Sequence, residues 1–200
     1  MSAPPGPDRS CTQRNSPALP TLVVVSGPPA TGKSTLARVL GARMGCPTII
    51  RDEIKQGMVM NAPDHLPDAD DPLNMPAWKT FFDTITVLLQ GGVTLVAEAA
   101  FQDRLWRPGL EPLMGIADIR IVRCVTPAST IVDRITERAR TDSHRVAHGD
   151  AALLADMQAG TYAPDQFAPI SLDVPTLVVD TSDGYSPGSA EINEFLLGPR

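Results

Sequence analysis

The segment Gly27-Pro-Pro-Ala-Thr-Gly-Lys-Ser34 has the residue types and spacing of a loop that binds phosphate groups. Its glycines permit the backbone dihedrals that turn several N–H groups toward one anion. A lysine at position 33 would reach the outer phosphates of a nucleotide, and the Ser34 hydroxyl would bind Mg²⁺. The sequence therefore predicts ATP and Mg²⁺ as cofactors, with Lys33 also catalytic, bound through Gly27, Pro29, Ala30, Thr31, Gly32, Lys33, Ser34 and Thr35.

The flanking segments are those that such a loop requires. Residues 21–26 are apolar and rich in β-branched side chains, which is typical of a strand covered on both faces. Residues 34–44 have helical periodicity and end before Gly45. A helix that begins at the loop presents its N-terminal N–H groups and the positive end of its dipole to the phosphates. This context distinguishes the motif from an ordinary glycine and proline turn.

Acidic residues follow two further predicted strands. Asp52 comes after residues 48–50, and Glu98 directly follows the run 93–97. In an open parallel sheet, ligands bind beyond the carboxyl ends of the strands. Asp52 is therefore a candidate general base that accepts the proton of an attacking hydroxyl, and it also suits the N-cap of a helix. Glu98 would organise Mg²⁺ through water or hold the acceptor; its alternative is a buried acid paired with an arginine.

Basic and aromatic residues near these acids complete the candidate site. Lys55, one turn after Asp52, would contact an anionic group on the acceptor, or it is a solvated surface charge. Phe101 follows the third strand closely and is assigned to the acceptor side. Arg134 and Arg138 share a helix face, where guanidinium groups could stabilise the charge of the transferred phosphate. An arginine-bearing lid over residues 138–150, with Arg140 and Arg145, would exclude water from the reaction.

The pattern of elements predicts the fold class. Strands are expected at 21–26, 48–50, 93–97, 118–125 and 176–180, separated by helices at 34–44, 52–60, 78–90, 103–115, 127–140 and 150–159, with a last helix at 189–197. Residues 61–76 contain many acids and prolines and are expected to form a loop. Strands that alternate with helices indicate an α/β/α sandwich with a five-stranded parallel sheet. Residues 21–200 are expected to form one domain.

Composition excludes several classes. The chain has 200 residues, 42% of them hydrophobic and 20% charged, which is typical of a globular protein. A formal charge of −6 argues against wholesale nucleic-acid binding. Three cysteines without metal-type spacing favour a reducing cytoplasm over a disulfide framework. No run approaches the roughly 20 apolar residues of a membrane span. Residues 1–20, rich in proline, are expected to be a flexible tail.

The run Arg51-Asp-Glu-Ile-Lys-Gln56, together with the phosphate loop, resembles P-loop kinases of the polynucleotide kinase, zeta toxin and chloramphenicol phosphotransferase group, often described as AAA-like ATPases. The resemblance covers about residues 22–185. It implies a nucleoside-kinase-like fold with strand order 2-3-1-4-5. It also implies that Asp52 is the general base, that Glu98 is a second acid near the acceptor, and that Arg138 is the lid arginine. Residues 180–185, with Asp183 and Gly184, resemble the adenine-side loop.

Two departures from the polynucleotide enzymes bear on the acceptor. Those kinases have an arginine where Lys55 stands here and an aspartate where Glu98 stands. The stretch 61–76 is also acidic, with Asp64, Asp68, Asp70 and Asp71, and would repel an anionic polymer. A kinase that acts on a hydroxyl of a neutral or cationic small molecule, such as an amine-bearing antibiotic, is the leading interpretation. A polynucleotide 5′-hydroxyl kinase and an ATP-dependent switch without an acceptor are the alternatives.

Overall fold

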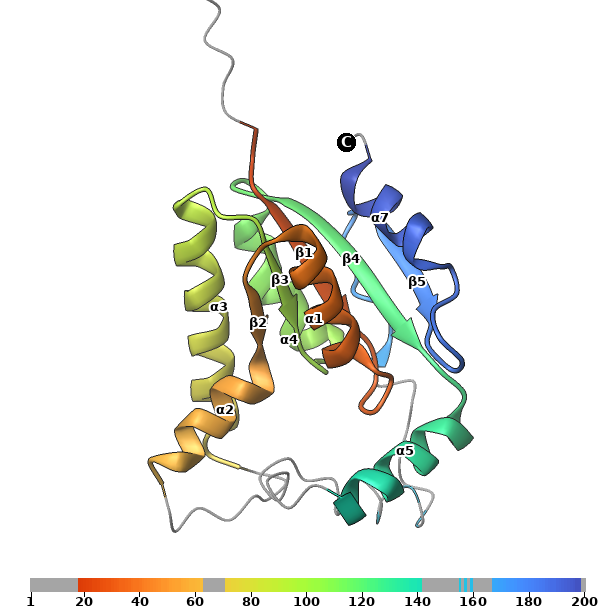
Figure 1. Ribbon diagram of the computed structural model, residues 1–200. Coiled ribbons are helices and arrows are strands. Elements are labelled where there is room, and N and C mark those ends of the chain that lie inside the picture. Colours follow the sequence, from red (N-terminus) through yellow and green to blue (C-terminus); the bar gives the residue numbers. More distant parts are fainter. Residues whose placement is uncertain are drawn as a thin grey trace, which may run out of the picture.

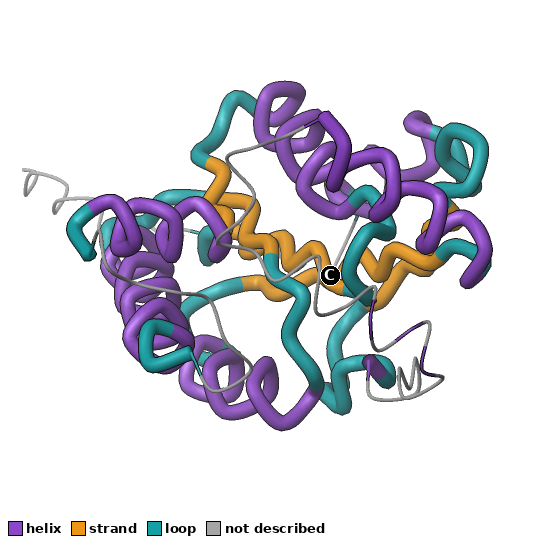
Figure 2. The backbone as a smooth tube through the Cα atoms, turned by 90° about the horizontal axis from the view of Figure 1, so that it is seen from below, coloured by secondary structure: helices purple, strands orange, loops and turns teal. Residues whose placement is uncertain are grey.

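The computed structural model has a central sheet of five parallel strands in the order β2-β3-β1-β4-β5 (Figure 1). The structure describes residues 18–62, 71–141, 155, 157, 159 and 167–198. Seen from below, the sheet lies between two layers of helices (Figure 2). The α/β/α class, the parallel sheet and the strand order are therefore confirmed. Of the predicted tail, residues 1–20, the structure describes only 18–20. Of the predicted lid, residues 138–150, it describes only the part that belongs to helix α5.

The strands are β1 (Thr21–Ser26), β2 (Thr48–Ile50), β3 (Leu95–Glu98), β4 (Asp118–Val125) and β5 (Thr176–Asp180). Four of them have the predicted bounds, and β3 begins two residues later than expected. In register, Val25 and Ile50 each pair with Glu98. The carboxyl ends of β1, β2 and β3 thus lie beside one another, at the lower edge of the sheet in Figure 1.

The described helices are α1 (Lys33–Met44), α2 (Arg51–Met60), α3 (Asn74–Gln90), α4 (Asp103–Leu110), α5 (Ala128–Thr141) and α7 (Ser189–Leu197), with a short 3-10 turn η1 (Glu111–Leu113) after α4. Helix α1 ends at Gly45, whose φ of 65° suits a glycine cap. The predicted helix 150–159 falls largely outside the described residues.

Two helix boundaries differ from the sequence prediction by more than one residue. Helix α3 begins at Asn74, although residues 61–76 were expected to form a loop. The Asp71 carboxylate accepts a hydrogen bond from the Leu73 amide at 2.8 Å, and Pro76 lies in the first turn, where no intrahelical N–H is needed. Helix α4 ends at Leu110 rather than continuing to 115, because Pro112 has no N–H with which to extend it.

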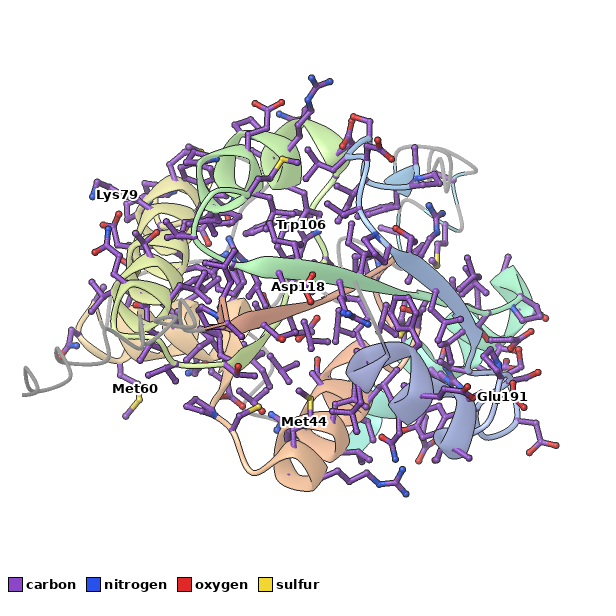
Figure 3. The ribbon with its side chains drawn as sticks, turned by 90° about the horizontal axis from the view of Figure 1, so that it is seen from above. Met44, Met60, Lys79, Trp106, Asp118 and Glu191 are labelled. Carbon is purple, nitrogen blue, oxygen red and sulfur yellow. The ribbon has the colours of Figure 1, made fainter. Side chains whose placement is uncertain are left out.

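Each face of the sheet has its own apolar layer. Alternate residues of β1 divide between them, with Leu22 and Val24 on one side and Val23 and Val25 on the other. The first layer contains the aromatic side chains of α3 and α4; Trp106 lies between α4 and the sheet, while Lys79 projects outward (Figure 3). The second layer is formed with α1 and α7. Burial on both faces explains why the interior of β1, from Leu22 to Val25, is entirely apolar.

Candidate active site

The phosphate loop joins β1 to α1, and its backbone has the conformation that the glycines were expected to provide. Gly27 has φ of 135°, and Gly32, at the start of α1, has φ of 75°. A Cβ on Gly27 would lie 2.3 Å from the Cys124 carbonyl oxygen, so only glycine fits there. Ala30 also has positive φ, at 60°. The loop is therefore held tightly against β4.

Lys33, Ser34 and Glu98 meet at the base of this loop. The Lys33 ammonium donates to the Pro28 carbonyl at 2.7 Å and lies 4.0 Å from a Glu98 oxygen. The Ser34 hydroxyl donates to the other Glu98 oxygen at 2.8 Å. Glu98 is 4% exposed. Burial raises its pKa; Lys33 opposes that shift, the charge of Asp52 adds to it, and the Ser34 hydrogen bond opposes it.

The position of Glu98 bears on the roles considered for it. The buried-acid alternative required an arginine partner, but the cation nearest to it is Lys33 and its hydrogen-bond donor is Ser34. Glu98 thus lies beside the phosphate loop and is absent from the lining of the acceptor-side cavity described below. This placement favours the magnesium role over the acceptor role. The assignment stays a prediction.

A second set of hydrogen bonds ties the phosphate loop to the segment that follows β5. The Thr181 hydroxyl donates to the Thr31 carbonyl at 2.7 Å, and the Thr31 hydroxyl donates to Pro28 at 2.8 Å. The Arg134 guanidinium donates to the Ala30 carbonyl at 3.3 Å and to the Thr181 carbonyl. Arg134 therefore reaches the loop, as expected, but carbonyl oxygens hold its donors. Asp183 and Gly184 follow Thr181 and are exposed, as is Thr35 on α1.

A cavity of about 310 Å³ lies beside Asp52. The pairing of Ile50 with Glu98 brings the residues that follow β2 beside those that follow β3. As a result Asp52 and Phe101, predicted from distant parts of the sequence, line one cavity. The described residues that line it are Arg51, Asp52, Asn74, Met75, Trp78, Ala100, Phe101, Arg104 and Leu105. The Asp52 side chain is 45% exposed, so a ligand in the cavity can reach its carboxylate.

Arg51 lies between the candidate base and the wall of this cavity. Its guanidinium donates to Asp52 at 3.1 Å and to the Asn74 amide oxygen at 2.8 Å. The group also lies 5.8 Å from the centre of the Phe101 ring, within the range of a cation–π contact. Arg51 thus fixes the orientation of Asp52 and links α2, α3 and the segment after β3.

Lys55 does not lie where the sequence placed it. Its ammonium forms an ion pair with Asp71 at 2.5 Å and donates to the Asn74 amide oxygen at 3.0 Å. The side chains of Lys55 and Asp71 are 11% and 0% exposed, and Lys55 is not among the residues that line the cavity. Lys55 is therefore not a solvated surface charge, and its contact with an anionic group of the acceptor stays a prediction. The same pair removes Asp71 from the acidic surface expected over residues 61–76.

The predicted lid residues cannot all be placed. Arg138 lies in α5, but its side chain is outside the described part of the structure, as are the side chain of Arg140 and the whole of Arg145. The roles of Arg138, Asp183 and Gly184 stay predictions. Within the described residues, no helix is both long enough and apolar enough to span a membrane.

The donor atoms at the base of the loop fit Mg²⁺ bound together with a nucleotide. Mg²⁺ prefers oxygen ligands and is usually held by one or two protein groups plus substrate phosphates. The Ser34 hydroxyl and the Glu98 carboxylate provide such oxygens beside the helix N-terminus that would receive the phosphates. Ser34 would contact the ion, and Glu98 would hold it directly or through water.

A comparison with known families identifies this arrangement. The model of the family described as an AAA domain matches residues 22–164, which include the phosphate loop, Asp52, Glu98 and Arg138. The chain belongs to this AAA domain family. It is a P-loop kinase-like protein, and the resemblance inferred from the sequence is confirmed.

Among curated proteins, this AAA domain protein is similar to uncharacterized proteins of Mycobacterium tuberculosis and Mycobacterium bovis. The identity is 29% over 153 residues. The match covers 72% of this chain and 31% of the relatives, so the chain spans about a third of their length.

Solved structures show the same fold. A proposed kinase from Chloroflexus aurantiacus has a TM-score of 0.70 at 26% identity, over 82% of this chain and 89% of that one. A sugar kinase from Janibacter has a TM-score of 0.61 at 17% identity, over 89% and 94% of the two chains. The APS kinase of M. tuberculosis, solved with AMPPNP and APS, has a TM-score of 0.54 at 20% identity, over 90% and 99%. At these last two identities only the fold is shared.

Several residues of the site were not singled out from the sequence. Arg51 stood next to Asp52 but was read only as part of the motif. Asn74 and Trp78 belong to α3, whose first turn had been assigned to the acidic loop. Thr181 was read only as part of the segment 180–185, and Arg104 carries no motif. Helical spacing from Asn74 to Trp78, both on the face toward the cavity, was the one signal that could have found two of them.

Proposed function

We propose that this AAA domain protein is an ATP- and Mg²⁺-dependent phosphotransferase that moves the terminal phosphoryl group of ATP onto a hydroxyl of a small molecule. The observation that supports this proposal is the arrangement of the two halves of the site. The phosphate loop with Lys33, Ser34 and Glu98 lies at the ends of β1 and β3, and the cavity with Asp52 lies at the end of β2, directly alongside.

The proposed roles follow from the positions of the groups. The backbone N–H groups of residues 30–34 and the Lys33 ammonium bind the phosphates. Mg²⁺, when bound, neutralises charge on the outer phosphates. Asp52 accepts the proton of the acceptor hydroxyl while the hydroxyl oxygen bonds to the terminal phosphorus. The bond between that phosphorus and the oxygen of ADP breaks at the same time. Arg51 orients the Asp52 carboxylate, and Arg138 is proposed to contact the transferred group.

The size of the cavity supports a small acceptor. About 310 Å³ is at the lower end of the range for sites that bind small molecules. Trp78 and Phe101 give it apolar walls, and the Trp78 N–H is already satisfied by the Leu105 carbonyl at 3.0 Å. Structural neighbours that are kinases, among them a sugar kinase and an APS kinase, support the same reaction class.

The test is phosphoryl transfer followed by mass spectrometry, with ATP, Mg²⁺ and a panel of hydroxylated metabolites, antibiotics and 5′-hydroxyl oligonucleotides. We expect one class of small molecule to gain a single phosphoryl group. Gain only on oligonucleotides would favour a polynucleotide kinase, and ATP binding with no transfer would favour a switch. Asp52→Asn should lower kcat by about 10²- to 10⁴-fold with ATP affinity kept. Asp83→Asn, an exposed acid on α3, is the control; near-full activity of Asp52→Asn would refute the base assignment.

A further inference from the structure

The charge of the acceptor cavity differs from the one expected from the sequence. The stretch 61–76 was expected to repel an anionic polymer, but Asp71 is buried against Lys55, and Asp64, Asp68 and Asp70 lie outside the described residues. Among the described residues, the cavity lining contains two guanidinium groups, Arg51 and Arg104, and one carboxylate. Its local charge therefore favours an anionic ligand over a cationic one.

Arg51 has a donor that the described structure does not use. Its two terminal nitrogens donate to Asp52 and Asn74, but its Nε is buried and has no hydrogen-bond partner among the described residues. A buried N–H without a partner is costly and rare in folded proteins. Each terminal nitrogen also carries a second N–H, and an anionic oxygen in the cavity could accept from these donors. The contacts with Asp52, Asn74 and Phe101 already fix the orientation of Arg51, so little order would be lost on binding.

Arg104 reaches the same cavity from a different element. It lies in the first turn of α4, and its Nε donates to the Gln102 side chain at 2.7 Å. Arg104 is exposed, and its planar fork offers further donors to a carboxylate or a phosphate. Two guanidinium groups from segments 53 residues apart therefore border one cavity whose remaining walls are Met75, Trp78, Ala100, Phe101 and Leu105, with Asn74.

We propose that the acceptor carries an anionic group, a carboxylate or a phosphate, in addition to its hydroxyl, and that Arg51 and Arg104 bind this group. This inference rests on the proposed phosphotransferase function. The hydroxyl lies at Asp52, the apolar part of the acceptor packs against Trp78 and Phe101, and the anion contacts the guanidinium groups. Binding at both ends holds the hydroxyl in place for transfer.

The test compares matched acceptors in the transfer assay. Hydroxy acids are paired with their methyl esters, and sugar phosphates with the unphosphorylated sugars; aminoglycosides are a third set. We expect transfer to charged members with at least about tenfold higher kcat/KM than to their neutral partners. The hydroxy-acid and sugar-phosphate sets separate a carboxylate from a phosphate. Transfer mainly to neutral or amine-bearing molecules would overturn the inference and leave the phosphotransferase proposal standing.

Arg104→Gln tests the residue assignment, with Arg107→Gln as the matched control. Arg107 lies on the same helix, is exposed, pairs with Glu111 and does not line the cavity. We expect Arg104→Gln to raise the acceptor KM by at least about tenfold with the KM for ATP unchanged, and Arg107→Gln to change neither. An unchanged acceptor KM in Arg104→Gln would overturn the assignment.

A binding measurement keeps the inference testable if no acceptor in the panel is phosphorylated. Phenyl phosphate and benzoate serve as anionic probes, and benzamide as the neutral one, with calorimetry as the readout. Binding of either anion that weakens in Arg104→Gln but not in Arg107→Gln would support an anion site even though the transfer proposal had failed. Equal binding of the anions by the parent, Arg104→Gln and Arg107→Gln, or no binding by any of them, would refute the anion site.

Discussion

Replacement of Lys55 by methionine should destabilise the protein substantially, because it leaves the Asp71 carboxylate buried without its cation. At an effective dielectric constant of about 20, charges 2.5 Å apart attract by about 6 to 7 kcal/mol. Desolvation of the two ions offsets much of this gain, so the pair as a whole contributes little. Removal of one partner from a buried pair nevertheless costs about 3 to 5 kcal/mol. We expect the lower value, about 3 kcal/mol, since the Lys55 side chain keeps some exposure.

The assay is urea and thermal unfolding of Lys55→Met beside Lys79→Met. Lys79 pairs with Asp83 at the same 2.5 Å, but the two side chains are 72% and 61% exposed. The control should lose less than about 0.5 kcal/mol. A loss of 3 kcal/mol corresponds to a fall in Tm of about 6 to 12 °C for a domain of this size.

A double-mutant cycle isolates the ion pair from other effects of the substitution. Asp71→Asn keeps an oxygen that can accept from the Leu73 amide, and so preserves the start of α3. The double variant Lys55→Met with Asp71→Asn should lose less stability than the two single variants added together. Strict additivity, or a Lys55→Met variant as stable as the Lys79→Met control, would refute the reasoning. A normal Tm with a raised acceptor KM would instead restore Lys55 as a contact of the acceptor.

Three further expectations concern buried groups of the site. Because the pKa of Glu98 is raised, the folded state holds that proton more tightly than the unfolded chain does; this stabilisation is complete at low pH and is lost as pH rises through the raised pKa. In thermal melts, the Tm of Glu98→Gln minus the Tm of the parent should therefore be larger at about pH 8 than at about pH 5. An equal difference at the two pH values would contradict this. Gly27→Ala should lower the free energy of unfolding by more than about 1 kcal/mol and weaken ATP binding, as measured by calorimetry. The added Cβ would clash with the Cys124 carbonyl, and the φ of residue 27 is positive. Gly57→Ala, with nothing within 4 Å, should not, and equal behaviour of the two would count against the argument. Burial raises the pKa of Cys124 to about 12, so its alkylation in the native protein should be far slower than that of half-buried Cys46 when followed by peptide mass spectrometry; comparable rates would show that the site opens.

Local patterns were sufficient where one segment determines its own structure. The phosphate loop is a contiguous run, and its glycines, lysine and serine act on one anion, so residues 27–34 identified it without tertiary information. Four strands were predicted with their bounds because each contains a run of β-branched residues and lies close to proline, glycine or polar residues that end it. The first turn of α3 was missed because proline and aspartate are typical of both loops and helix starts.

The sequence by itself determined the fold class, the nucleotide loop and two carboxylates at strand ends. Only the tertiary structure decided what each charge faces. Lys55 and Asp71 are 16 residues apart, and nothing local shows that they cancel one another. Arg51 and Arg104 come to one cavity because β2 pairs with β3 and α4 follows β3. Electrostatic character depends on distance and burial in three dimensions, so the charge of the acceptor site could not be read from the acidic composition of one segment.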